Sequence, residues 1–258
     1  MSPVHETARS LAFWIVPASV LFVLALSVAY SHSDIPLFLA IHNFGRQLPA
    51  AFWQSVTLFG NGLVLLACIA VWLRSRPQSA WAGLLGAIPA GLIVRAFKNF
   101  ADIPRPRGLL GDAVHPLGPL YEHTSFPSGD SVTIFLLAGI VCWTYRSRSI
   151  QLIAILAAAL VALSRIAMGV HWPTDVLAGG GAGWCCAWVG VRVARRIDVT
   201  QRWMQVILAV FILAASVYLF RARTQLPLAD ALRYAIATIG CLLSARALVS
   251  QARSPAAR

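Results

Sequence analysis

The sequence predicts an all-α protein, a polytopic bundle of six to eight transmembrane helices. Of its 258 residues, 59% are hydrophobic and only 12% are charged, and the mean hydropathy is +0.73. Soluble domains carry about 25% charged residues. The apolar residues are gathered in runs of roughly 20, which is the length a helix needs to cross the hydrocarbon core of a bilayer. Composition and patterning therefore both indicate a membrane protein.

The first apolar run covers residues 11–30. A signal peptide is the alternative interpretation, because the small residues at 27–29 resemble a cleavage site. The run is long for a signal sequence and further spans follow it, which favours an uncleaved first helix. Residues 31–49 carry apolar side chains at helical spacing and predict a short amphipathic helix at the membrane interface. Those apolar positions are Ile35, Leu37, Phe38, Ile41 and Phe44.

Seven more apolar runs follow, each bounded by polar residues. They cover residues 52–73, 80–97, 128–145, 150–163, 174–193, 203–220 and 228–248. A polar loop of about 28 residues separates the run ending at 97 from the run beginning at 128, and long loops of this kind usually have a function. Gly179 and Gly183 lie four apart in one run, which predicts close packing against another membrane helix.

The runs suggest three parts. Residues 1–50 hold the first transmembrane helix and the amphipathic segment, residues 51–196 hold a membrane core that includes the long polar loop, and residues 197–258 hold carboxy-terminal transmembrane helices.

The net charge of +12 follows the membrane topology. Most arginines sit in short clusters between apolar runs, as in cytoplasmic loops, whereas a nucleic-acid surface would show a stripe of basic residues along one element. We therefore expect no nucleic-acid partner. The predicted cytoplasmic set comprises Arg74, Arg76, Arg146, Arg148, Arg192, Arg195, Arg196 and Arg202. Basic residues on the opposite side, among them Lys98, Arg105 and Arg165, require another explanation.

The five cysteines all lie within apolar runs and lack the spacing of metal ligands. They are Cys68, Cys142, Cys185, Cys186 and Cys241. Small apolar packing between helices explains them, and we predict neither a disulfide nor a metal site. No cofactor is expected, and the sequence indicates no particular oligomeric state.

Three polar clusters fall on the predicted non-cytoplasmic side, at the ends of helices. They cover residues 98–106, 125–131 and 164–175. Lys98 is the only lysine of the chain, and Arg105 and Arg165 add planar guanidinium groups that suit phosphate oxygens. Ser128 and Gly129 open a helix, where free backbone N–H groups attract an anion. The clusters together predict a site for a tetrahedral anion.

His171 and Asp175 are four residues apart, so the carboxylate can hold the imidazole in a single tautomer and leave the other ring nitrogen free to attack phosphorus. Each cluster alone has a structural explanation: interfacial anchors for Lys98 and Arg105, an ordinary helix start, or a satisfied His–Asp pair. Their occurrence together on one side favours a catalytic site.

These residues resemble the type 2 phosphatidic acid phosphatase (PAP2) superfamily, in its membrane-bound bacterial branch. The family pattern is K-x6-RP, then PSGH, then SR-x5-H-x3-D. Residues 98–106 match the first motif and residues 164–175 match the third. The second motif matches at residues 127–129 but ends in Asp130 instead of histidine. The motifs span residues 98–175, and the flanking helices fit only in layout.

The resemblance implies a role for each matching position. His171 would be the nucleophile that forms a phosphohistidine, and Asp175 would orient it. The phosphate would be bound by Lys98, Arg105, Arg165 and the backbone around Ser128 and Gly129. The family uses no metal. The implied protein is an integral enzyme of a bacterial inner membrane, with its site facing the periplasm or exterior.

Asp130 stands where the family has the histidine taken to protonate the leaving group, and a carboxyl group is ordinarily ionised at neutral pH. Three explanations are open. Asp130 acts as the acid if burial and the bound phosphate keep it protonated. His123, seven residues earlier, supplies the proton instead. Or the leaving group needs little protonation.

The third explanation favours a lipid diphosphate such as undecaprenyl diphosphate. A phosphate monoester has a second pKa of about 6 and leaves far more easily than an alkoxide, whose conjugate acid resembles water with a pKa near 15.7. The predicted function is hydrolysis of a lipid phosphate or diphosphate among membrane lipids. Phosphotransfer to another lipid, and non-catalytic binding or transport of a lipid phosphate, are the alternatives.

Overall fold

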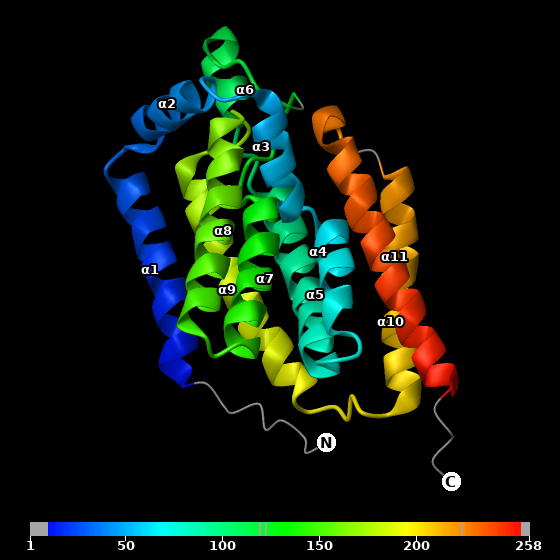
Figure 1. The fold of residues 1–258 in the computed structure, drawn as a ribbon. Coiled ribbons are helices and arrows are strands. Elements are labelled where there is room, and N and C mark those ends of the chain that lie inside the picture. Colours follow the sequence, from blue (N-terminus) through cyan, green and yellow to red (C-terminus); the bar gives the residue numbers. More distant parts are fainter. Residues whose placement is uncertain (1–9, 119, 122, 223, 254–258) are drawn as a thin grey trace.

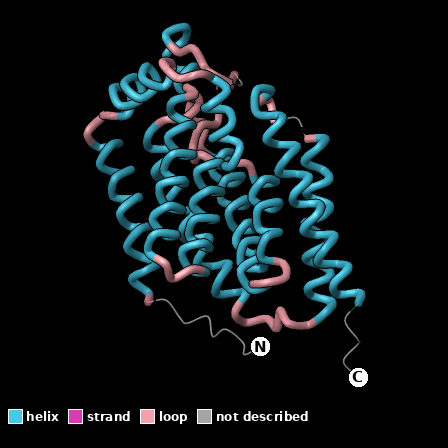
Figure 2. The backbone as a smooth tube through the Cα atoms, in the orientation of Figure 1, coloured by secondary structure: helices cyan, strands magenta, loops and turns pink. Residues whose placement is uncertain are grey.

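The computed structural model describes residues 10–118, 120–121, 123–222 and 224–253, and all regular structure in them is helical (Figures 1 and 2). The elements are α1 (Leu11–Tyr30), α2 (Asp34–Gly45), α3 (Ala50–Thr57), η1 (Leu58–Gly60), α4 (Gly62–Ile69), η2 (Ala70–Trp72), α5 (Pro77–Phe100), α6 (Pro106–Leu110), η3 (Gly111–Ala113), α7 (Gly129–Thr144), α8 (Arg148–Ala167), α9 (Pro173–Ala194), α10 (Arg202–Arg221), η4 (Pro227–Ala229) and α11 (Asp230–Arg253). The predicted all-α membrane bundle is confirmed.

Six helices in the described part of the chain are long and apolar enough to cross a membrane. They are α1, α5, α8, α9, α10 and the segment of η4 and α11. Their outward faces are apolar: Ile153 is 66% exposed, Leu242 59% and Val210 50%. Side chains of this kind face lipid in a bilayer, whereas water would expel them.

The span predicted at residues 52–73 is not one continuous helix. The chain breaks at Asn61, and the segments Ala50–Gly60 and Gly62–Trp72 meet at 67°. Asn61 has an extended backbone, and its side-chain oxygen accepts the backbone N–H of Leu63 at 2.9 Å. Asparagine is a favoured helix N-cap, so it starts a new helix inside an apolar run. Counting the bent pair as one span gives seven.

The run at 128–145 becomes α7, which has only 16 residues and is mostly buried. It lies within the bundle against α9, and the glycine spacing explains the close approach. A Cβ added at Gly183 would lie 2.2 Å from the carbonyl oxygen of Val132, and one at Gly179 would lie 2.7 Å from that of Ser128. The predicted close packing is confirmed, and its partner helix is α7.

Helix α9 also packs against α5 and α1. On the α5 side, a Cβ at Gly190 would lie 2.2 Å from the carbonyl oxygen of Ala82. On the α1 side, the ring of Trp184 lies 6.3 Å from that of Trp14, tilted by 56°, and its indole N–H donates to the carbonyl of Phe13. Helix α1 therefore packs against the bundle through α9.

Helix α2 lies across one end of the bundle (Figure 1). It buries Phe38 and His42 fully while Phe44 is 58% exposed, which fits a helix at the membrane interface. The Asp34 carboxylate accepts the backbone N–H of Thr174 at 3.0 Å and its hydroxyl at 2.7 Å. This pair fastens the start of α2 to the start of α9.

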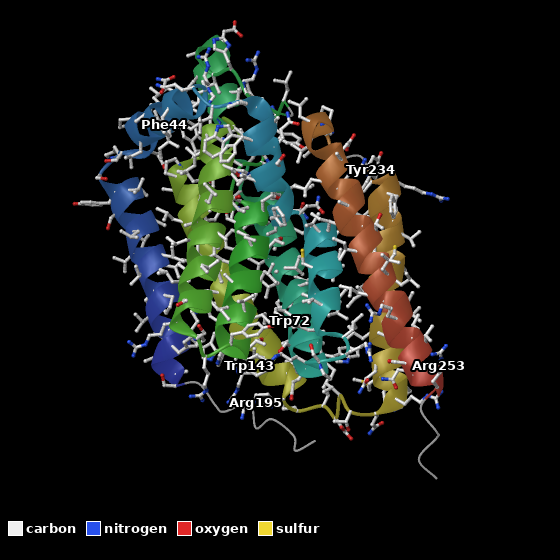
Figure 3. All side chains as sticks on the ribbon, viewed as in Figure 1. Phe44, Trp72, Trp143, Arg195, Tyr234 and Arg253 are labelled. Carbon is white, nitrogen blue, oxygen red and sulfur yellow. The ribbon has the colours of Figure 1, made fainter. Side chains whose placement is uncertain are left out.

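The two ends of the bundle differ in charge. The turns that join η2 to α5, α7 to α8 and α9 to α10 all lie at one end, where Figure 3 labels Arg195 and Arg253. The predicted cytoplasmic arginines lie in these turns or in the adjoining ends of the helices. Helices α2 and α6 lie at the other end, with the three polar clusters.

Candidate active site

The three polar clusters meet where α5 and α8 end and where α7 and α9 begin. The first and third clusters are joined by the indole N–H of Trp172, which donates to the carbonyl of Pro104 at 2.8 Å. The second and third are joined by the backbone N–H of Ser128, which donates to the carbonyl of Asp175 at 3.1 Å. The tertiary fold thus brings residues from 98 to 175 into one site.

His171 lies in the turn before α9 and is only 2% exposed. Its Nδ1 faces the Oδ2 atom of Asp175 at 3.2 Å. The same oxygen accepts the hydroxyl of Ser125 at 2.5 Å and the backbone N–H of Trp172 at 2.8 Å. Two further donors thus hold the carboxylate in place, and it fixes the imidazole with its proton on Nδ1. The expected His171–Asp175 contact is present.

The other ring nitrogen of His171, Nε2, faces the guanidinium of Arg105 at 3.4 Å from Nη1. Burial lowers the pKa of His171 well below its ordinary value, and the positive charges of Arg105, Arg165 and Lys98 lower it further. The imidazole is therefore neutral at pH 7, with an unprotonated Nε2 lone pair. A neutral imidazole beside cations is suited to attack an anionic phosphate.

Arg105 is 5% exposed and held on several sides. It donates to the carbonyls of His123 and Val170, both at 2.9 Å, and its guanidinium lies 4.5 Å from the centre of the Tyr121 ring. Burial, together with the charge of Arg165, lowers the pKa of Arg105 to about 10, so it stays charged at neutral pH. It presents a fixed positive group to whatever lies at Nε2 of His171.

Arg165, in the last turn of α8, is a second buried cation of the site. Its Nη1 lies 2.9 Å from Oδ2 of Asp130 and donates to the hydroxyl of Thr57 at 2.7 Å. Its Nε is buried and has no hydrogen-bond partner among the described residues. A buried donor without an acceptor costs about 1–3 kcal/mol, so this N–H indicates where a ligand oxygen would bind.

Ser128 is the N-cap of α7 and does not itself face the site. Its hydroxyl accepts from the backbone N–H of Ser131 at 3.3 Å and from the Ser131 hydroxyl at 2.9 Å. Its backbone N–H is taken by Asp175. The free donors at this helix start are those of the first helical residues, Gly129 and Asp130, which have no acceptor within the helix.

Lys98 lines a cavity of about 570 Å³ between α4, α5 and α7. Its polar lining residues Asn61, Asn99 and Asp130 lie where α4 and α7 begin and α5 ends, and apolar residues further along these helices, such as Leu65 and Leu136, form its floor. A phosphate at the polar end with an apolar chain along the floor fits this shape.

The structure does not place the His123 ring in this group. The side chain is 73% exposed, and Nδ1 lies 4.0 Å from Oδ1 of Asp102. Only the backbone carbonyl of His123 takes part, through Arg105. The position of His123, seven residues before Asp130, does not predict which way its ring points, because the segment between them is irregular. Among the described residues, no three His, Cys, Asp or Glu side chains converge as a metal-ligand group.

The model of the PAP2 superfamily matches residues 79–198. The undecaprenyl-diphosphatase BcrC of Bacillus subtilis (strain 168) is 31% identical over 143 residues, which cover 54% of this chain and 70% of BcrC. The chain belongs to the PAP2 superfamily. It is an enzyme, a membrane phosphatase.

Two solved PAP2 structures share the fold. The crystal structure of Aquifex aeolicus LpxE has a TM-score of 0.58 at 31% identity, covering 62% of this chain and 94% of that chain. The first transmembrane PAP2-type phosphatidylglycerolphosphate phosphatase from Bacillus subtilis has a TM-score of 0.52 at 21% identity, covering 74% and 100%. The latter likeness concerns the fold alone.

Ser125 and Thr57 are site residues that sequence reasoning did not identify. Ser125 falls within a polar cluster, yet only its 2.5 Å bond to Asp175 gives it a role. Thr57 lies more than 100 residues before Arg165 in an apolar run, and no sequence signal marks it. Both are contacts of tertiary structure, which motif spacing cannot reveal.

Gly60 provides a test of the Asp130–Arg165 pair. A Cβ at Gly60 would lie 2.5 Å from the Cβ of Asp130, whereas one at Gly62 would meet nothing within 4 Å. We expect Gly60→Ala to displace Asp130, and Arg165 with it, and to lower kcat/KM about 10-fold, since misplacing a catalytic group by about 1 Å can cost up to 10²-fold.

Gly62→Ala is the matched control and is expected to stay within about 2-fold of wild type, because the added methyl group has room and misplaces nothing. Steady-state kinetics of the two purified variants make the comparison. Equal activity of both would show that the position of Asp130 has no influence on the reaction.

Proposed function

We propose that the protein hydrolyses a phosphate from a membrane lipid diphosphate, such as undecaprenyl diphosphate, through a phosphohistidine formed on His171. The observation that carries this proposal is the arrangement around His171: Nδ1 faces Asp175 at 3.2 Å while the neutral Nε2 faces Arg105 at 3.4 Å. One nitrogen is fixed and the other is directed at a phosphate-binding cation, which is the geometry of an activated nucleophile.

The reaction proceeds in two displacements. Nε2 of His171 forms a bond to the terminal phosphorus, and the bridging P–O bond breaks with its electron pair going to the oxygen of the leaving lipid phosphate. Arg105, Arg165, Lys98 and the N–H groups at the start of α7 stabilise the charge on the transferred oxygens. A water molecule then attacks the phosphorus of the phosphohistidine, the P–N bond breaks with its electron pair returning to Nε2, and the water's protons leave with the inorganic phosphate.

The pairing of Asp130 supports a diphosphate substrate. Its carboxylate lies 2.9 Å from Nη1 of Arg165, so it is paired with a cation instead of being free to act on a leaving group. With the His123 ring turned toward Asp102, neither predicted acid is well arranged to protonate an alkoxide. A lipid phosphate needs little protonation to leave, and BcrC, a relative, carries the name of a diphosphatase.

The arginine clusters predict how the protein is oriented in the membrane. Arginine clusters mark one end of the bundle as cytoplasmic, so the site, at the other end, faces the periplasm. We place the enzyme in a bacterial inner membrane, where the cavity between α4, α5 and α7 receives the lipid chain. The carboxy-terminal hairpin of α10 and α11 packs against α4. Within the hairpin, Ser216 of α10 lies beside Gly240 of α11.

Phosphate release by the detergent-purified protein tests the proposal. The substrates are undecaprenyl diphosphate, phosphatidylglycerophosphate and phosphatidate, with a chelator present and no added metal. We expect release from the diphosphate to exceed release from either monoester at least 10-fold in kcat/KM. Preference for a monoester would overturn the substrate assignment. Transfer of phosphate to an added lipid alcohol without release would identify a phosphotransferase.

Asp130→His tests the leaving-group argument. Restoring the family's histidine supplies an acid, and general acid catalysis contributes about 10²–10⁴-fold where the leaving group needs it. We expect phosphatidate hydrolysis to rise about 10-fold or more, with diphosphate hydrolysis changed less than about 3-fold. The kcat/KM values of both substrates give the answer. No gain on the monoester would disconnect Asp130 from substrate choice.

A further inference from the structure

Arg95 is a positive charge that the reaction described so far does not use. It lies on α5, within a membrane-spanning helix, three residues before Lys98. No hydrogen bond or ion pair links its side chain to any other described residue. Ionisable residues inside a membrane are costly and are retained mainly where they serve a pathway or a site.

The side chain of Arg95 lines the same 570 Å³ cavity as Lys98 and Asp130. Residues i and i+3 lie on one face of a helix, about 4.5 Å apart along its axis. Because α5 runs toward the active-site end, Arg95 lies one turn deeper in the bilayer than Lys98. Below it the cavity wall is apolar, with Gly91 and Ala87 on α5 and Leu136 on α7.

Among the described residues, no charged group of the site forms an ion pair with Arg95. Asp130, the acidic residue of the cavity, pairs with Arg165 at 2.9 Å. Arg105 faces Nε2 of His171, and the charge of Arg165 also acts on that imidazole. Along α5, Arg95 lies between Lys98 and the apolar positions Gly91 and Ala87, all of which line the same cavity.

We propose that Arg95 binds the lipid-proximal phosphate of a diphosphate, which is the leaving group. The inference rests on the proposed function and names a specificity residue for it. In a lipid diphosphate the second phosphate lies between the attacked phosphate and the chain, and Arg95 lies at the matching depth. A lipid monophosphate has no group there.

Arg95 also explains how the leaving group departs from a site in which no acid is positioned to protonate it. When the bridging P–O bond breaks, its electron pair stays on the leaving phosphate, which gains negative charge. A guanidinium held next to that phosphate stabilises the charge without transferring a proton, and it does so more strongly in the transition state than in the ground state. The alkoxide oxygen of a monoester would form at the same bridging position, but it carries no second phosphate for the guanidinium to bind.

The first experiment measures binding without turnover. His171→Ala protein in detergent is titrated with farnesyl diphosphate and with farnesyl monophosphate, and the titrations are repeated with Arg95→Gln added. We expect Arg95→Gln to weaken binding of the diphosphate roughly 10- to 100-fold, the range for a lost charge-assisted hydrogen bond, and binding of the monophosphate less than about 3-fold. Arg95→Lys, which keeps the charge, is expected to recover most of the difference.

Arg46→Gln is the matched control. Arg46 is an exposed arginine that follows α2 at the same end of the bundle, and its removal is expected to alter neither affinity. Thermal unfolding of each variant verifies the fold. In the active enzyme, Arg95→Gln is expected to lower kcat/KM for undecaprenyl diphosphate roughly 10- to 100-fold and for phosphatidate less than about 3-fold.

The outcomes separate this inference from the proposed function. Equal effects of Arg95→Gln on diphosphate and monophosphate, in binding or in kinetics, would overturn the role of Arg95 and leave the phosphatase proposal intact. Absence of phosphate release from every lipid, with selective loss of diphosphate binding in Arg95→Gln, would overturn the proposed reaction and support the role of Arg95.

Discussion

Replacing His171 by alanine is expected to abolish phosphate release, lowering kcat/KM by about 10⁴-fold or more, the scale found when a catalytic nucleophile is removed. No other described side chain presents a neutral nitrogen to Arg105, so no other nucleophile replaces it. The measurement is phosphate release from undecaprenyl diphosphate, or from whichever lipid the wild-type protein hydrolyses best.

His123→Ala is the matched control for His171→Ala. The His123 ring is exposed and lies 4.0 Å from Asp102, so its loss is expected to change kcat/KM less than about 3-fold. A loss of 10²-fold or more, the scale of general acid catalysis, would instead identify His123 as the acid that protonates the leaving group. Substantial activity in His171→Ala would exclude the phosphohistidine mechanism.

The pH dependence of kcat/KM gives a second test of the role of His171. Its pKa is lowered in the folded protein, first by burial and then by the neighbouring cations. The reactive neutral form therefore persists as the pH falls through 6.5 and is lost only below that value. We expect the acid limb of kcat/KM that requires His171 to lie below pH 6.5, after correction for ionisation of the substrate measured separately. An acid limb above pH 6.5 would contradict a neutral, buried imidazole.

Replacing Asp175 by asparagine is expected to lower kcat about 10³-fold with a smaller change in KM. An amide can donate to Nδ1 of His171 and so favour the wrong tautomer, which in related His–Asp arrangements costs up to about 10⁴-fold. Asp175 contacts His171 and not the substrate, so it is a positioning residue. Steady-state kinetics separate kcat from KM, and the pH profile of the variant is expected to shift with the altered imidazole.

Asp34→Asn is the control for a merely structural effect. Asp34 also fastens the start of α9, through Thr174, but it has no contact with His171. Its replacement is expected to lower thermal stability slightly while kcat stays within about 3-fold. If Asp34→Asn and Asp175→Asn reduced kcat equally, the carboxylate of Asp175 would serve only to anchor the helix.

The sequence by itself determined the all-helical membrane bundle, because apolar runs of span length have few other ways to satisfy their backbone in lipid. It also determined the residues that resemble the PAP2 motifs, since their spacing is a property of the chain. The glycine pair at 179 and 183 predicted a close helix contact, which the structure confirms against α7.

The tertiary structure alone decided which side chains meet. Asn61 breaks an apolar run because its side chain caps a new helix, and the resulting bend carries Thr57 to Arg165 and Gly60 to Asp130. His123 turns outward although it is close in sequence, while Ser125 turns inward to Asp175. Arg95 lies inside a predicted apolar run, and only the fold places it in the cavity with Lys98 and Asp130. Such contacts join residues far apart in the chain, so packing and not local pattern determines them.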